Sequence, residues 1–116
     1  MRLLWLSGRK LGEDLAQTTE SNLAISLSNN GIDVTLVSPG FWSEGSFRHI
    51  SLKRSNIMGL ETISGARDMR RILRNLKLSE FDLMLVDWRY VVHLREFLEK
   101  SSLAWKIIDR GPPVRT

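Results

Sequence analysis

Apolar runs and amphipathic stretches alternate along the whole chain. Short, mostly apolar or alternating runs predict five strands, at residues 2–7, 33–38, 47–52, 81–86 and 104–108. Apolar residues at helical spacing predict three helices, at residues 15–29, 61–76 and 90–100. Because helices separate most successive strands, the pattern favours an α/β fold. We expect a Rossmann-like three-layer α/β/α arrangement with a mainly parallel sheet of about five strands.

Glycine, proline and asparagine mark the ends of these elements. Asn30-Gly31 predicts a helix end, because both residues tolerate positive φ, and Pro39-Gly40 ends the second strand. The length of 116 residues suits one domain with one core. Past the last strand the chain continues through Pro112-Pro113 without a closing helix. We therefore expect residues 1–116 to form a single Rossmann-like domain that is a fragment of a larger two-domain protein.

Composition narrows the classes of protein. Hydrophobic residues make up 42% and charged residues 26% of the chain, as in soluble proteins, and no apolar run approaches the roughly 18 residues of a membrane span. The absence of cysteine excludes disulfides and thiolate chemistry, and a cytoplasmic location is the default expectation. His49 and His93 lie outside any zinc-ligand spacing, so we expect no metal and assign both to structural or surface roles. The net charge of +4 suits an anionic partner, although it is also that of a mildly basic soluble protein.

The loop after the first predicted strand carries Gly8, Arg9, Lys10 and Gly12. Backbone N–H groups and cations ahead of a helix suit a phosphate or sugar hydroxyls in the crevice of an open sheet. The simpler interpretation is a strand-to-helix turn that needs glycine for its dihedral angles. The loop is not a P-loop, because Glu13-Asp14-Leu15 stand where Gly-Lys-Ser or Gly-Lys-Thr would, and it lacks the Gly-x-Gly-x-x-Gly dinucleotide fingerprint.

Polar residues also begin the helix that follows this loop. Thr18, Thr19 and Glu20 lie in its first turns, where hydroxyls and a carboxylate suit a sugar acceptor. The alternative is a solvated helix face, since such residues are ordinary near helix starts. Thr19 is retained as a candidate substrate contact.

A polar cluster follows the fourth and fifth predicted strands: Asp87, Trp88, Arg89, Asp109 and Arg110. The carboxyl ends of parallel strands line the ligand crevice of open sheets. Asp87 is therefore a candidate base or sugar ligand, Trp88 a platform for a sugar ring, and Arg110 a substrate contact. The alternative is two local ion pairs, Asp87 with Arg89 and Asp109 with Arg110, beside a packed tryptophan.

Four arginines share one face of the predicted helix at 61–76: Arg67, Arg70, Arg71 and Arg74. The apolar residues lie on the opposite face: Ala66, Met69, Ile72, Leu73 and Leu76. Because like charges repel, the stripe suits an anion or an anionic membrane surface; the alternative is a solvated outer face. Since the core is expected to use the apolar face, membrane contact would be electrostatic, without insertion.

Several of these phrases resemble a known family. The loop at 8–12, the helix at 14–29 and the phrase Leu23-Ala24-x-x-Leu27-x-x-x-Gly31-x-x-Val34-Thr35-Leu36-Val37 resemble the start of the retaining glycosyltransferases of family 4. These enzymes have two Rossmann-like domains that face each other across a cleft, the GT-B architecture. The segment at 81–88 is similar to the family's fourth-strand phrase, with Asp87 where many members have histidine. The adjacent glycine pair common in the first loop is replaced by Gly8 and Gly12.

The resemblance implies most of an N-terminal, acceptor-side domain that is inactive by itself. The whole enzyme would transfer a sugar from a nucleotide-sugar donor with retention, without a metal or cofactor, and the donor would bind mainly through a C-terminal domain that this chain lacks. The acceptor would be a sugar or a lipid-linked sugar. Family members that act on lipid-linked acceptors lie on anionic membranes through basic helices, which implies a cytoplasmic protein peripheral at the membrane.

One alternative function comes from a different class. A flavodoxin-like, non-catalytic binding module for an anionic ligand would show the same strand and helix pattern. A response regulator is disfavoured, because strand one ends in Ser7-Gly8 instead of paired acids. We expect no nucleic-acid partner, because the arginines lack interleaved aromatic residues and no nucleic-acid-binding motif is present.

Overall fold

Alternating side chains on the central strand account for the layers of this fold. The computed structural model describes residues 1–8, 18–40, 47–53, 57 and 59–108. On β1 (Arg2–Leu6), Leu3 and Trp5 enter one apolar core and Leu4 and Leu6 enter another. A strand that is apolar on both faces needs cover on both faces, and helices supply it.

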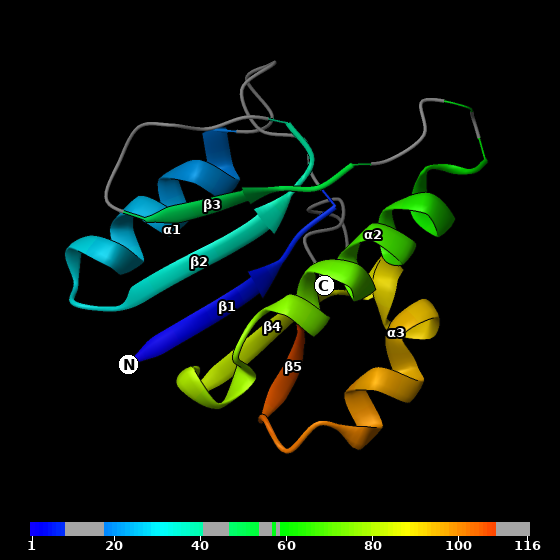
Figure 1. Cartoon of the computed structure of the whole chain (residues 1–116). Coiled ribbons are helices and arrows are strands. Elements are labelled where there is room, and N and C mark those ends of the chain that lie inside the picture. Colours follow the sequence, from blue (N-terminus) through cyan, green and yellow to red (C-terminus); the bar gives the residue numbers. More distant parts are fainter. Residues whose placement is uncertain (9–17, 41–46, 54–56, 58, 109–116) are drawn as a thin grey trace, which may run out of the picture.

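The described residues form five strands, three α-helices and one short 3-10 helix. In chain order after β1 these are α1 (Thr18–Asn29), β2 (Asp33–Ser38), β3 (Arg48–Ser51), α2 (Glu61–Asn75), η2 (Leu78–Glu80), β4 (Leu83–Asp87), α3 (Trp88–Lys100) and β5 (Trp105–Ile108). The strand order is β3-β2-β1-β4-β5 and every pairing is parallel (Figure 1). The predicted Rossmann-like α/β fold is thereby confirmed.

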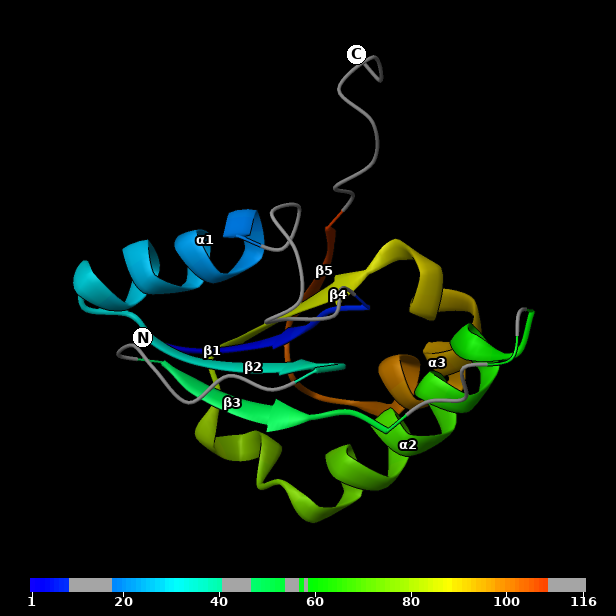
Figure 2. The same ribbon diagram turned by 90° about the horizontal axis from the view of Figure 1, so that it is seen from above.

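The helices divide between the two faces of the sheet. Figure 2 shows α1 on one face and α2 with α3 on the other. The smaller core, beneath α1, joins Leu3 and Trp5 to Ala24, Val34, Leu36 and Phe47. The larger core lies beneath α2 and α3, and their apolar faces supply most of its buried residues: Ala66, Met69, Ile72, Leu73, Tyr90, Val91, Leu94 and Leu98. The apolar face predicted for α2 therefore packs on the sheet.

The end of α1 follows the predicted helix stop. Gly31 has a φ of +88°, its N–H donates to the Ser28 carbonyl, and the Ile32 N–H donates to the Leu27 carbonyl. This hydrogen-bond pair is the Schellman motif, which favours glycine at the left-handed position. It turns the chain directly into β2.

Two element boundaries around β4 differ from the prediction. The strand begins at residue 83, not 81, because η2 continues into a turn in which the Phe81 N–H donates to the Leu78 carbonyl. The helix predicted to start at residue 90 starts at Trp88, because the Asp87 side chain accepts a hydrogen bond from the Arg89 N–H and caps α3. Asp87 thus ends a strand and begins a helix without an intervening loop.

Within the part of the chain that the structure describes, no helix is both long and apolar enough to cross a bilayer.

Candidate functional site

The strand order reverses between β1 and β4. From β1 the chain proceeds outward through β2 and β3, then returns to place β4 and β5 on the other side of β1. The carboxyl ends of the two strands meet, since Leu6 of β1 is in register with Val86 of β4. Ligands of open α/β sheets bind at such a switch point. Gly8 lies just after the end of β1 and Asp87 is the last residue of β4, so both lie at the position where a ligand is expected.

Asp87 is held by four N–H donors. Its Oδ1 accepts from the backbone N–H of Arg89 at 3.1 Å and from Arg89 Nε at 3.2 Å. Its Oδ2 accepts from the Gly8 N–H at 3.1 Å and from Arg89 Nη2 at 2.8 Å. A carboxylate offers about four acceptor positions, so these donors use the full capacity of the group. Asp87 therefore ties the end of β1 to the start of α3.

The same contacts determine the protonation of Asp87. Burial, with 7% of the residue exposed, would by itself raise the pKa of the carboxyl. The hydrogen bonds and positive charge of Arg89 and the Gly8 N–H outweigh that effect and hold its pKa below the usual value. An anionic group with filled acceptor positions is a poor proton acceptor. The geometry thus favours the ion-pair interpretation of Asp87 over a role as general base.

A tyrosine fixes this corner of the fold. Tyr90 of α3 is 2% exposed. A Cβ atom added at Gly8 would lie 2.8 Å from Tyr90 Cε2, and a Cβ atom added at Gly65 of α2 would lie 2.8 Å from the Tyr90 hydroxyl oxygen. The ring therefore occupies space that only glycine leaves open at both positions. The sequence pattern did not identify Tyr90 or Gly65 as part of the site, although a glycine inside a helix is a signal of close packing.

Trp88 is the exposed aromatic residue of the switch point. It is 52% exposed in the first turn of α3, next to the buried Asp87. An exposed indole ring can stack on the apolar face of a sugar, and here the backbone that carries the ring is fixed by the capped helix. The structure thus joins Gly8 to Asp87 through a hydrogen bond and places Trp88 directly after Asp87 at the carboxyl edge of the sheet.

Several predicted contacts lie outside the described residues: Arg9, Lys10, Gly12, Asp109 and Arg110. Thr18, Thr19 and Glu20 occupy the first turn of α1, but their side chains are not among those described. Their proposed roles stay predictions.

The four arginines of α2 have different environments. Arg67, Arg71 and Arg74 are exposed, whereas Arg70 is half-buried, and its Nη1 donates to the His93 carbonyl of α3 at 2.9 Å. Arg71 pairs with Asp68, with 2.7 Å between Nη2 and Oδ1. Arg67 and Arg74 have no ion-pair partner among the described residues. Part of the charge on the stripe is therefore neutralised internally.

The two histidines occupy separate places. His49 of β3 is half-buried, with Nε2 2.8 Å from the hydroxyl oxygen of Ser38. Burial lowers the pKa of His49, against a smaller opposing effect of a hydrogen bond with the Ser38 backbone. His93 is exposed on α3. Among the described residues, no group of three or more His, Asp or Glu side chains is arranged to hold a metal ion.

Two solved structures share this fold. A sucrose-phosphate synthase from Thermosynechococcus elongatus superposes with a TM-score of 0.64 at 9% identity, over 97% of this chain and 34% of that one. A UGT transferase from Siraitia grosvenorii, in complex with UDP, superposes with a TM-score of 0.59 at 16% identity, over 92% of this chain and 27% of that one. Neither a protein-family model nor a curated protein sequence matches the chain.

Both structural neighbours are glycosyltransferases, and the chain spans about a third or less of each. The chain therefore shares its fold with a part of each of these two glycosyltransferases, as the predicted resemblance to the GT-B architecture implies. The features that belong to family 4 stay predictions.

Proposed function

We propose that this chain is the acceptor-side domain of a glycosyltransferase that takes its sugar from a nucleotide-sugar donor. The observation that carries the proposal is the switch point, where the exposed Trp88 directly follows Asp87, whose carboxylate is anchored to the Gly8 N–H, in a domain with a glycosyltransferase-like fold. In this role Trp88 stacks on the acceptor sugar, and Asp87 fixes the strand and helix ends around it. The retaining, metal-independent reaction implied by the family 4 resemblance belongs to the same proposal.

Sugar binding to the 116-residue chain tests the acceptor site. Neutral monosaccharides and disaccharides are added to the 15N-labelled chain, and the Trp88 indole and Gly8 amide signals are followed. We expect both signals to shift saturably with at least one sugar. Replacing Trp88 with alanine should weaken that binding about tenfold, the loss of one aromatic stacking contact.

The matched control is Val92→Ala, which shortens another exposed apolar side chain of α3. This variant should bind the sugar as wild type does, and Trp88→Phe should restore most of the affinity. If Trp88→Ala bound the sugar as tightly as wild type, Trp88 would not be the acceptor platform. Saturable binding of anions without any sugar binding would favour the non-catalytic binding module.

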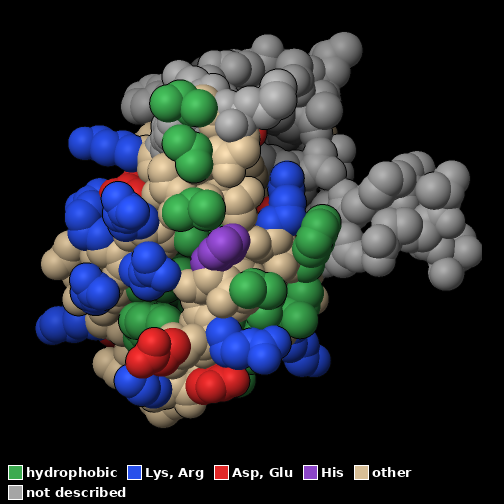
Figure 3. All heavy atoms as spheres, turned by 90° about the vertical axis from the view of Figure 1, so that its right-hand side faces the viewer, with side chains coloured by type: hydrophobic (Ala, Val, Ile, Leu, Met, Phe, Trp, Pro, Cys, Tyr) green, Lys and Arg blue, Asp and Glu red, His purple; other side chains and the backbone are tan. Residues whose placement is uncertain are grey.

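We further propose that the start of α2 touches an anionic membrane surface. Ile57 and Ile63 are 64% and 47% exposed, and Leu60 lies between them in sequence with comparable exposure. Figure 3 shows a column of hydrophobic side chains beside a group of Lys and Arg side chains on this face of the molecule. Apolar residues near Arg67, a cation with no ion-pair partner among the described residues, suit shallow insertion combined with charge attraction. This differs from the purely electrostatic contact expected from the sequence.

Co-sedimentation with phosphatidylglycerol-containing vesicles tests this surface. We expect binding that weakens with added salt and that falls about tenfold when Ile57 and Ile63 are both replaced by serine. Ile107→Ser, the loss of one comparably exposed isoleucine on β5, is the control and should leave binding unchanged. Equal losses in both variants, or no binding to anionic vesicles, would contradict the proposal.

A further inference from the structure

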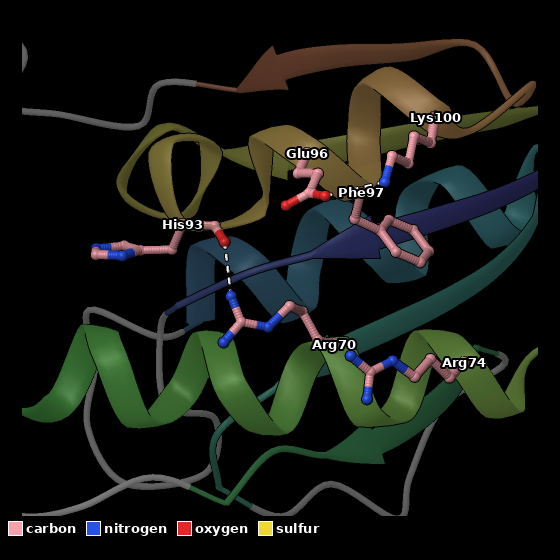
Figure 4. A pocket seen from close by; sticks show the side chains of 6 residues that line it. All are labelled: Arg70, Arg74, His93, Glu96, Phe97 and Lys100. Carbon is pink, nitrogen blue, oxygen red and sulfur yellow. Dashed lines mark hydrogen bonds and ion pairs between the residues drawn. The ribbon is translucent and has the colours of Figure 1, made fainter.

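A hollow of about 280 Å³ lies between α2 and α3, away from the switch point. It is lined by Arg70 and Arg74 of α2 and by His93, Glu96, Phe97 and Lys100 of α3. Figure 4 shows the two arginine side chains on the side of α2 that faces α3, with Phe97 and Lys100 across from them. The lining residues include none of Gly8, Asp87 and Trp88, so the hollow is distinct from the proposed acceptor site.

The charges around the hollow favour an anion. Arg70, Arg74 and Lys100 are cationic, and Glu96 is the one carboxylate among the lining residues. Glu96 is already paired with Lys100, at 2.9 Å between Oε1 and Nζ. The two arginines have no carboxylate partner among the described residues. The lining therefore keeps an excess of positive charge.

One cation of the hollow is fixed in position. The Arg70 guanidinium donates through Nη1 to the His93 carbonyl at 2.9 Å, which spans the gap between the two helices. Within the described part of the chain this is the one hydrogen bond of its side chain, so other N–H groups of the guanidinium can meet a ligand, and Arg74 follows one helical turn later. Two planar guanidinium groups on the same helix face suit the tetrahedral oxygens of a phosphate, which accept paired N–H bonds.

The volume of the hollow and the Phe97 side chain restrict the ligand further. A volume of about 280 Å³ is at or below the lower end of pockets for drug-sized ligands, so it suits a phosphate with a small attached group. Phe97 is half-buried and adds apolar surface beside the cations. We infer that the hollow between α2 and α3 is a second binding site, specific for a phosphate monoester whose apolar part lies against Phe97. The phosphate is either that of a soluble ester or a lipid head group.

Two probes distinguish these sources. For the soluble form, phenyl phosphate is titrated into the 15N-labelled chain at constant ionic strength, and inorganic phosphate is titrated for comparison. For the lipid form, binding to phosphatidylcholine vesicles is measured with and without phosphatidic acid. A soluble ester should shift the amide signals at 70–74 and 93–100 saturably, with phenyl phosphate binding more tightly than inorganic phosphate. Binding only to phosphatidic acid vesicles, with the same mutational pattern, would assign the phosphate to a lipid.

Matched variants distinguish a specific phosphate site from general electrostatic attraction to a basic surface. Arg74→Gln should weaken phosphate binding about fivefold to tenfold, whereas Arg95→Gln, the loss of an exposed arginine of α3 that does not line the hollow, should change it less than about twofold. Glu96→Gln should tighten binding, because it removes the carboxylate and frees Lys100. Equal losses in Arg74→Gln and Arg95→Gln, or no saturable binding of either probe, would overturn the inference. The sugar titration follows the signals of Trp88 and Gly8, whereas the phosphate titration follows residues 70–74 and 93–100. The acceptor-site proposal and the phosphate-site proposal can therefore fail independently.

Discussion

Alanine in place of Gly8 is expected to lower the free energy of unfolding by about 2 kcal/mol, within the range for overpacked cores. The new Cβ would lie 2.8 Å from Tyr90 Cε2 and 3.1 Å from Asp87 Oδ2. The buried ring cannot retreat, because its hydroxyl oxygen and its opposite edge already approach Gly65 of α2. Chemical denaturation of the variant and wild type measures the difference.

Gly31→Ala provides the control for this contact. Gly31 has positive φ but no atom within 4 Å of an added Cβ, so its penalty, about 1 kcal/mol, comes from the backbone alone. Combined with Tyr90→Leu, the Gly8→Ala penalty should largely disappear, while the Gly31→Ala penalty should persist. A Gly8→Ala penalty that is unchanged in the Tyr90→Leu background would show that contact with Tyr90 is not its cause.

Replacing Asp87 with alanine should cost about 3 kcal/mol of unfolding free energy. The change removes the cap of α3, worth about 1 kcal/mol, and also removes the buried hydrogen bonds that the carboxylate accepts from the Gly8 N–H and the Arg89 guanidinium. Asp33→Ala is the matched control: its carboxylate pairs with Arg2 on the surface, with 3.1 Å between Oδ2 and Nε, and should cost less than about 1 kcal/mol. Equal costs at the two positions would contradict the structural role of Asp87.

Acid titration examines the same carboxylate independently. Because the folded-state pKa of Asp87 is lowered, its stabilisation is fully present above the unfolded-state pKa of about 3.9. It is lost as the pH falls through the lower folded-state value. The unfolding free energy should therefore fall more steeply on acidification in wild type than in Asp87→Asn. Parallel curves for the two proteins would mean that Asp87 is not held as an anion.

The fold could be predicted from the sequence because its signals are local. The apolar runs of β1, β2 and β4 and the helical spacing in α2 each determine an element from its own residues. Asn30-Gly31 likewise specifies the end of α1 through dihedral angles that few other residues tolerate. The sequence pattern places the start of α3 two residues too late, because Asp87, which caps this helix, is also the last residue of β4.

The site was only partly predictable, because its contacts are tertiary. Asp87 and Trp88 could be assigned to the crevice, since the carboxyl ends of parallel strands share one edge of the sheet. That Tyr90 packs against both Gly8 and Gly65 depends on how β1, α2 and α3 meet. The phosphate hollow likewise depends on the packing of α2 on α3, so only its arginines could be identified from one helix pattern.

The central claim is tested most directly by sugar transfer in the protein purified at its native length from the cells that produce it. Nucleotide sugars are assayed with candidate acceptors, for wild type and for Trp88→Ala. We predict transfer from at least one donor, with the acceptor KM raised about tenfold by Trp88→Ala and the donor KM nearly unchanged. Absence of transfer from every donor, or an equal effect of Trp88→Ala on both KM values, would contradict an acceptor-side domain.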